Sequence, residues 1–304
     1  MTQSTSAAEA LAVRQGVAFP RQRLRWLRTF VRTQPLGTLG FLLILLMVIG
    51  AVFAPLLRTS DPAAFGSEVL KAPSWAHWMG TNREGRDVWS RVLYGGRVSL
   101  EIGIAVVFIS VIGGTIIALV AGYLGGIADF LISRVIDVLI AFPSILFALT
   151  LRTSFEGEFD KQLLLVVSIC IIFTPVITRI MRGAVLEQRG AMYVEAARVL
   201  GASEWRIMFR HLLPNLAGLM IVVTSTTLPA AILTESALSF LGVGLDISTP
   251  SWGGDLSGPA RTFFTSAWWI AVFPGLALSV TVLAFNLLGD SLRDTLDPRL
   301  RGKR

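Results

Sequence analysis

The chain has 304 residues, 53% hydrophobic and only 15% charged, whereas about a quarter of the residues in a soluble domain are charged. This composition excludes a large soluble core and indicates a polytopic membrane protein. The net charge of +7 could suggest nucleic-acid binding, but an excess of cytoplasmic arginine explains it more simply, and we expect no nucleic-acid partner. One cysteine, Cys170, and two separated histidines exclude a disulfide framework and a cysteine- or histidine-rich metal site.

Residues 1–35 form an arginine-rich arm that is too long and too polar for the charged region of a signal peptide. Residues 36–57 are apolar and long enough to cross roughly 30 Å of hydrocarbon, so we interpret them as an uncleaved signal anchor and first transmembrane helix. Residues 58–97 are the longest polar connection, and we expect an extracytoplasmic loop there.

Five further apolar segments are each long enough to span a bilayer: 98–123, 130–151, 163–181, 216–241 and 268–288. With the first segment they predict an all-α membrane protein of about six transmembrane helices, with a core at 98–290 and a basic cytoplasmic tail at 291–304. Four of the segments contain a proline that we expect to kink its helix: Pro143, Pro175, Pro229 and Pro274.

The distribution of basic residues predicts the orientation. If the N-terminus lies inside, the inner segments hold 18 of the 27 lysines and arginines, and the outer loops hold nine. Because inner loops are the ones enriched in these residues, both termini are expected to be cytoplasmic.

Small residues recur every four positions at the end of the second span and just after it, at Gly114, Ala118, Gly122 and Gly126. Such a stripe lets two membrane helices approach closely, so we expect a packing face. Glycine is also common in membrane helices without this role, and that interpretation stays open.

A few charged residues lie within the apolar spans. Arg134 and Asp137 are three residues apart on one helix and are expected to neutralise each other. Glu235, followed by Ser236, lies deep in the fifth span. Two interpretations are equally open: a polar element of a substrate path or an interhelical hydrogen bond at the bundle centre, and a packing contact with a neighbouring subunit.

Residues 187–215 carry charges between two strongly apolar segments and predict a helical elbow beside the membrane. A first helix over about 190–200 ends at Gly201, which tolerates a left-handed C-cap. Ser203 caps a second helix with Glu204 in its first turn, and Pro214 is expected to close that helix.

The second helix of this elbow is predicted to be amphipathic. Trp205, Met208 and Leu212 fall on one face at helical spacing, while Arg206 and Arg210 share another. Apolar residues here could contact either a partner or the protein's own helices, and spacing alone does not separate the two.

The sequence contains no recognisable catalytic motif. None of the three lysines follows a G-x-x-x-x-G pattern, so no P-loop is present, and H-E-x-x-H and G-x-S-x-G are absent as well. We therefore expect the chain to be no enzyme, to bind no cofactor and no metal, and to receive any ATP-derived energy from another chain.

The elbow resembles the EAA loop of permease subunits from binding-protein-dependent ABC importers. Glu195, Ala196 and Ala197 are followed by Gly201 at the family's spacing and then by Leu213 and Pro214. His211 stands where the family pattern has isoleucine, which resembles the H-x-L-P-N of the peptide-importer branch.

Further segments extend the resemblance from about residue 33 to the C-terminus. They are MGTNREGRDVWSRVLYGGRVSL (79–100), AFPSILFAL, ILTESALSFLGVG, TPSWGGDL and NLLGDSLRDTLDPRLRG. Together they resemble the C-type permease subunit of the dipeptide/oligopeptide/nickel family. LRTSFEGEFDKQ (151–162) departs from that family in being more charged; we expect it outside the membrane, in reach of the delivering protein.

The resemblance implies a type I ABC importer permease (MetI-like) fold in a bacterial or archaeal plasma membrane. It implies a heterodimer with a related B-type permease, two ATP-binding subunits that hold ATP and Mg²⁺, and an extracytoplasmic solute-binding protein that delivers di- or oligopeptides or similar small solutes. Residues carried over to ATPase coupling are Glu195, Ala196, Ala197, Gly201, Ala202, Ser203, Glu204, Ile207, Met208, Leu213 and Pro214. The alternative is an ATP-independent secondary transporter or channel; a membrane-embedded enzyme is a weaker one.

Overall fold

The computed structural model describes residues 31, 33–155, 157–246 and 248–296, and these are predominantly helical. The arm expected at 1–35 and the tail expected at 291–304 therefore lie largely outside the described residues. Within the described ranges no strand is present and extended pairing is confined to isolated bridges, such as that between Thr81 and Asp87, so the prediction of an all-α protein is confirmed.

The long helices match five of the six predicted spans. Four of the spans are α3 (Pro35–Val52), α5 (Val88–Leu119) continuing into the π-helical η1 (Val120–Leu124), α8 (Lys161–Arg189) and α14 (Trp269–Leu296). A fifth joins α10 (Glu204–Arg206), η2 (Ile207–Leu212) and α11 (Leu213–Phe240). Counting α6 (Gly126–Ala141) and α7 (Ser144–Ser154) as one bent span gives the expected six. Shorter helices are α4 (Ala54–Leu57), α9 (Met192–Val199), α12 (Trp252–Asp255) and α13 (Gly258–Thr262).

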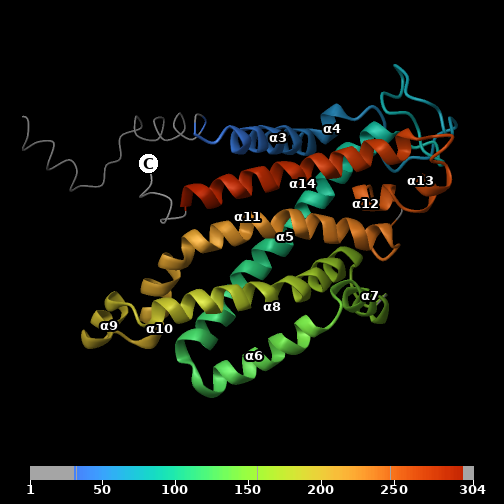
Figure 1. The fold of residues 1–304 in the computed structure, drawn as a ribbon. Helices are drawn as coiled ribbons and strands as arrows, with labels where there is room; N and C mark the ends of the chain where they lie inside the picture. Colours follow the sequence, from blue (N-terminus) through green and yellow to red (C-terminus); the bar gives the residue numbers. More distant parts are fainter. Residues whose placement is uncertain (1–30, 32, 156, 247, 297–304) are drawn as a thin grey trace, which may run out of the picture.

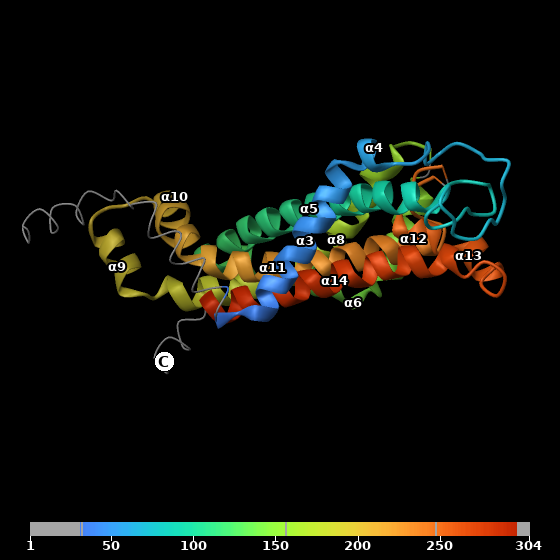
Figure 2. The same ribbon diagram turned by 90° about the horizontal axis from the view of Figure 1, so that it is seen from above.

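The long helices run side by side in an elongated bundle (Figures 1 and 2). Helix α5 packs against α8 and α11, and α14 packs against α3 and α11. One end of the bundle carries α9, α10, the first turn of α3 and the last turn of α14. The opposite end carries α12, α13 and the connection between α4 and α5.

The small-residue stripe is a packing face for three of its four members. A Cβ added at Gly114 would lie 3.0 Å from Ile177 of α8, and one at Gly122 would lie 2.9 Å from Val185. Ala118, between them, is fully buried. Gly126 does not belong to this face: it begins α6 with φ +58°, and an added Cβ would meet nothing within 4 Å. The turn after η1 carries it away from α8.

The third predicted span is not one continuous helix. The helix axes of α6 and α7 differ in direction by 91°, across a break at Phe142 and Pro143. Proline was expected to kink this span; here it restricts the preceding residue to extended backbone, and the helix ends instead. Pro175, Pro229 and Pro274 lie inside α8, α11 and α14.

The second span begins at Val88, earlier than the predicted residue 98. Asp87 caps the helix, because its side chain accepts a hydrogen bond from the backbone N–H of Ser90 at 2.8 Å. Thr59 and His77 also hydrogen-bond to the Asp87 carboxyl, at 2.7 and 2.9 Å. Burial acts to raise the pKa of Asp87, but these hydrogen bonds outweigh it and hold the pKa below its usual range.

Ion pairs join α6 to α8. Arg182 donates to Asp129 at 2.6 Å, and Arg179 donates to Asp137 at 2.6 Å. The expected contact between Arg134 and Asp137 is present but longer, at 3.8 Å. The main partner of Asp137 is thus on a neighbouring helix, which the spacing within one helix could not show.

Candidate functional site

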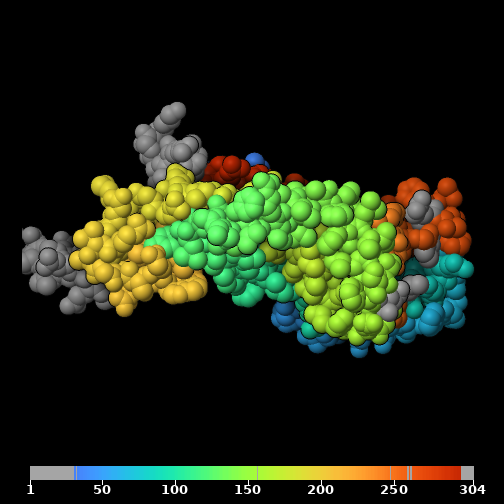
Figure 3. All heavy atoms as spheres, turned by 90° about the horizontal axis from the view of Figure 1, so that it is seen from below, coloured from blue at the N-terminus to red at the C-terminus, as the bar shows by residue number. Residues whose placement is uncertain are grey.

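The elbow, residues 187–215, is built from the end of α8, α9, α10, η2 and the start of α11, and it projects from one end of the bundle (Figures 1 and 3). In the space-filling view its surface forms the end of the coloured, described part of the molecule on that side. This position leaves its outer surface free of contacts with the rest of the described bundle.

The corner of the elbow closes as predicted at Gly201. This residue has φ +80°, and its N–H donates to the carbonyl of Arg198 at 3.0 Å. The N–H of Ala202 donates to the carbonyl of Ala197 at 3.0 Å, which satisfies a second carbonyl at the end of α9. A Cβ at Gly201 would meet nothing within 4 Å, so the need for glycine is conformational and not steric.

The second helix begins as predicted but does not end where expected. The Ser203 hydroxyl accepts a hydrogen bond from the N–H of Arg206, at 3.4 Å, and Glu204 lies in the first turn. Pro214 does not close the helix, which continues through η2 into α11 and reaches Phe240. A proline is tolerated in the first turn of a helical segment, and the π-helical stretch ends at Leu212, just before it.

The buried face of the elbow consists of Ile207, Met208 and Leu212, all at most 1% exposed, together with Val194 and Ala197 of α9. Ile207 and Met208 were expected to serve ATPase coupling. The structure places both in the core, so they pack against the protein's own helices, and their role in coupling stays a prediction. The five buried residues pack α9 and η2 against the hydrophobic core of the bundle.

The exposed face carries different apolar residues from those expected. Met192, Val199 and Leu200 are 86%, 87% and 86% exposed. Trp205 was predicted to share a face with Met208 and Leu212, yet it is 62% exposed and stacks on Phe209 with ring centroids 5.7 Å apart. We call Met192, Val199, Leu200, Trp205 and Phe209 the apolar tip. Met192, Val199 and Leu200 were not predicted from the sequence. They lie away from the buried residues Val194 and Ala197, and this spacing along α9 is the signal that could have indicated them.

Polar contacts anchor the elbow to η1. Arg198 donates to the Tyr123 hydroxyl at 3.4 Å, and Arg189 donates to the carbonyl of Gly122 at 3.2 Å. Glu195, Ala196, Ser203 and Glu204 are exposed on the elbow, Leu213 is half-buried and Pro214 is exposed. A displacement of the tip would therefore be passed to α5 and α8 as well as to α11.

Glu235 lies at the centre of the bundle and is fully buried. Its carboxylate accepts hydrogen bonds from Ser99 of α5 at 3.0 Å, from Ser239 at 2.8 Å and from Ser236 at 3.2 Å. The bond from Ser99 joins two helices. A carboxylate enclosed in its own chain cannot touch a neighbouring subunit, so the interpretation as an intersubunit contact is wrong.

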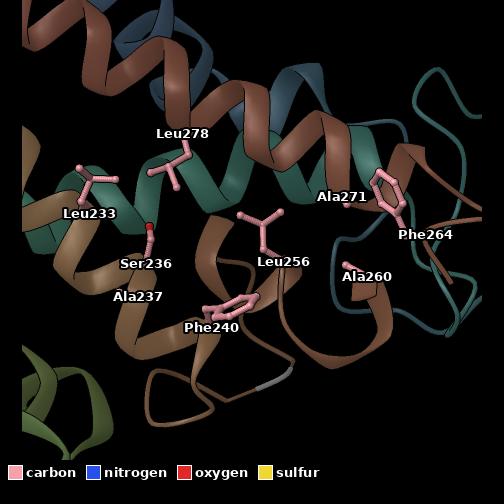
Figure 4. Close-up of a pocket in the computed structure, with 9 residues that line it drawn as sticks. All are labelled: Leu233, Ser236, Ala237, Phe240, Leu256, Ala260, Phe264, Ala271 and Leu278. Carbon is pink, nitrogen blue, oxygen red and sulfur yellow. The ribbon is translucent and has the colours of Figure 1, made fainter. Parts of the chain in front are cut away.

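An apolar groove of about 660 Å³ lies beside this polar centre (Figure 4). Its lining residues are Leu233, Ser236, Ala237, Phe240, Leu256, Ala260, Phe264, Ala271 and Leu278. Ser236 is the one polar side chain among these nine, and Glu235 is not one of them. The carboxylate thus stabilises helix packing, whereas Ser236 faces the groove.

Replacing Glu235 with leucine is expected to lower the free energy of unfolding by about 1–3 kcal/mol, because buried hydroxyl donors lose their acceptor. Thermal unfolding of the purified chain in detergent measures this. The control is Glu101→Leu on the exposed side of α5, where we expect a change within about 0.5 kcal/mol. An unchanged melting temperature for Glu235→Leu, beside an unchanged control, would show that the hydrogen bonds contribute little.

Comparison with known proteins identifies relatives over most of the chain. Residues 114–302 match the family described as binding-protein-dependent transport system inner membrane component. The chain is 38% identical over 279 residues to the dipeptide transport system permease protein DppC of Alkalihalophilus pseudofirmus, covering 91% of this chain and 90% of the relative. It is 40% identical to a putative peptide transport system permease protein of Brucella suis, covering 86% and 88%. It is also 40% identical to the glutathione transport system permease protein GsiD of Pectobacterium atrosepticum, covering 90% of each.

Proposed function

The chain belongs to the family of binding-protein-dependent transport system inner membrane components, and on this premise we propose that it is the C-type permease subunit of an ABC importer that carries di- or oligopeptides. The observation that carries the proposal is the elbow, a projecting and well-anchored element with an exposed apolar tip. Because the sequence has no P-loop, the energy of ATP must reach the bundle through such a contact.

We assign the proposed partners to the two ends of the bundle. Two ATP-binding subunits, which hold ATP and Mg²⁺, dock at the elbow end. A solute-binding protein docks at the opposite end, where α12, α13 and the connection between α4 and α5 lie. A related B-type permease completes a heterodimer within the lipid bilayer. The names of the relatives support a multi-subunit transport system but specify none of these partners.

The proposed orientation places the elbow in the cytoplasm of a bacterium or archaeon, with the chain in the plasma membrane. The first turn of α3 and the last turn of α14 lie at the elbow end, in keeping with an even number of spans. The excess of lysine and arginine predicted for the inner side supports the same orientation.

In the proposed mechanism, the elbow acts as a stiff lever. Closure of the ATP-binding subunits moves the apolar tip, and Ile207, Met208 and Leu212 carry the movement into the core because they are packed without exposed surface. The continuous helix from Glu204 to Phe240 then tilts as a unit, which changes the bundle from inward-open to outward-open. A flexible connection would absorb this displacement, whereas the closed corner at Gly201 does not.

We infer the class of cargo from the names of the relatives, which are permease proteins of dipeptide, peptide and glutathione transport systems. We propose small peptides as the cargo of this chain. Titration of the partner solute-binding protein with a set of di- and tripeptides tests this, with an oligosaccharide and a nickel chelate as comparison ligands. Tight binding of either comparison ligand without peptide binding would overturn the cargo assignment.

Reversing the charge at Glu195 is expected to reduce ATP-driven uptake strongly and to weaken retention of the ATP-binding subunits. Glu195 is exposed on α9, so its replacement with arginine disturbs a docking surface without disturbing the core. Co-purification of the ATP-binding subunits with the tagged chain, followed by uptake in proteoliposomes, measures both effects. Glu158→Arg, on the exposed connection between α7 and α8, is the matched charge reversal for retention of the ATP-binding subunits. Full retention and full uptake in Glu195→Arg would count against a docking role for this residue.

A further inference from the structure

A cavity of about 390 Å³ with charged residues in its wall lies at the end of the bundle opposite the elbow. Its wall is formed by the segment before α5, the first turns of α5, the end of α11 with the loop that follows it, α12 and the start of α14. The charged residues that line it are Arg83, Glu84, Arg91, Asp246 and Asp255. This volume lies at the small end of the range of about 300–1,000 Å³ that is usual for small-molecule sites.

Asp255 is the buried anion of this cavity. Both Nε and Nη2 of Arg91 donate to its Oδ1 atom, at 2.7 and 2.6 Å. The side chains of Arg91 and Asp255 are only 5% and 10% exposed. The other carboxylate oxygen, Oδ2, is buried and has no hydrogen-bond partner among the described residues. Arg91 therefore satisfies one oxygen of the carboxylate and leaves the second to another donor.

The position of Asp255 is fixed by its short helix. The Ser251 hydroxyl caps α12 by accepting a hydrogen bond from the N–H of Gly254 at 3.1 Å. Trp252 is 2% exposed, and its indole N–H donates to the carbonyl of Val92 at 3.0 Å. The carboxylate is thus held on a rigid turn against α5, as an organised binding site requires.

The remaining charges of the cavity have nearby partners or lie at its rim. Glu84 pairs with Arg86 at 3.4 Å, and Asp246 pairs with Lys161. Arg83 is exposed, with its guanidinium 6.0 Å from the centre of the Phe263 ring. Burial raises the pKa of the Asp255 carboxyl, although Arg91 acts to lower it, so a second cationic donor would further stabilise the charged form. An ammonium group supplies such a donor, and the rim arginine can receive a carboxylate.

We propose that this cavity binds a small zwitterionic peptide, with the protonated amino terminus on Oδ2 of Asp255 and the carboxylate toward Arg83. The inference rests on the proposed function for the class of cargo, and it adds a recognition site within the permease subunit itself. Cargo leaving a solute-binding protein at this end meets the cavity before the bundle opens.

Binding to the purified full chain in nanodiscs tests the proposal without ATP-binding subunits or solute-binding protein. Isothermal titration with alanyl-alanine is expected to show saturable binding. N-acetyl-alanyl-alanine, which lacks the ammonium group, is expected to bind at least about tenfold more weakly, as loss of a charge-assisted hydrogen bond predicts. Equal affinity for the two ligands, or no binding of alanyl-alanine, would overturn the proposal.

The variant Asp255→Asn keeps the shape of the side chain and is expected to weaken alanyl-alanine binding by about tenfold or more. Glu158→Gln removes an exposed carboxylate from the segment between α7 and α8 and is expected to leave the affinity within about twofold. Unchanged affinity in Asp255→Asn would overturn the assignment. The comparison of the free and acetylated ligands on the unaltered chain stays decisive if Asp255→Asn fails to fold. Failure of the proposed function would instead appear as absence of ATP-driven uptake by the complete importer.

Discussion

Replacing Val199 and Leu200 together with aspartate is expected to abolish ATP-driven uptake while leaving the chain folded and inserted. Both side chains are more than 85% exposed, so the substitutions remove no core packing. In the assembly that we propose, the same positions face an ATP-binding subunit. Two unpaired charges in an apolar contact would cost several kcal/mol, which corresponds to a loss of affinity of roughly a hundredfold or more.

The measurement is co-purification of the ATP-binding subunits with the tagged double variant, beside its melting temperature. Trp75→Asp provides the control, because Trp75 is 97% exposed but lies in the connection between α4 and α5 at the opposite end of the bundle. We expect this control to retain the ATP-binding subunits. Retention by the double variant as well would show that the apolar tip is not the docking surface.

Replacing Gly201 with valine is expected to reduce uptake at least about tenfold with little change in the amount of inserted protein. The native φ of +80° costs a residue with a Cβ about 1–2 kcal/mol, and a β-branched residue is affected most. The strain would be relieved by opening the corner, which loosens α9 relative to η2. Because an added Cβ meets no atom within 4 Å, the effect is one of conformation and not of a clash.

Gly201→Asn is the matched control, since asparagine adopts the left-handed conformation more readily than other residues with a Cβ. Uptake by proteoliposomes is expected to be close to normal for Gly201→Asn and greatly reduced for Gly201→Val. Equal uptake by the two variants, at equal expression, would contradict the importance of the left-handed corner.

The corner of the elbow could be predicted because its determinants are local. Gly201 and Ser203 act through hydrogen bonds to residues within a few positions along the chain, and sequence spacing reports such contacts. The second helix was predicted less well, because the spacing analysis assumed an α-helix. Ile207 and Leu212, five residues apart, are both fully buried, as the wider turn of η2 allows. The same change of period moves Trp205 out of the buried face.

The start of α5 and the environment of Glu235 could not be predicted from the sequence, because both depend on contacts between residues far apart in the chain. The start of α5 was placed too late because Arg91 and Arg97 resemble loop residues. Arg91 is nevertheless buried by its ion pair with Asp255, 164 residues later. Glu235 likewise acquired a definite environment only through Ser99, 136 residues earlier. An ionisable residue in an apolar segment indicates that Glu235 has a polar partner. Only the packing of α11 on α5 shows that this partner is Ser99.

The most direct test of the central claim is transport by the purified chain reconstituted in proteoliposomes with its proposed B-type, ATP-binding and solute-binding partners. We expect uptake of a labelled dipeptide only when ATP is hydrolysed, and no uptake when a non-hydrolysable analogue replaces ATP or when the ATP-binding subunits are omitted. Uptake at the same rate by this chain without the ATP-binding subunits, driven by an ion gradient alone, would contradict the account and identify a secondary transporter.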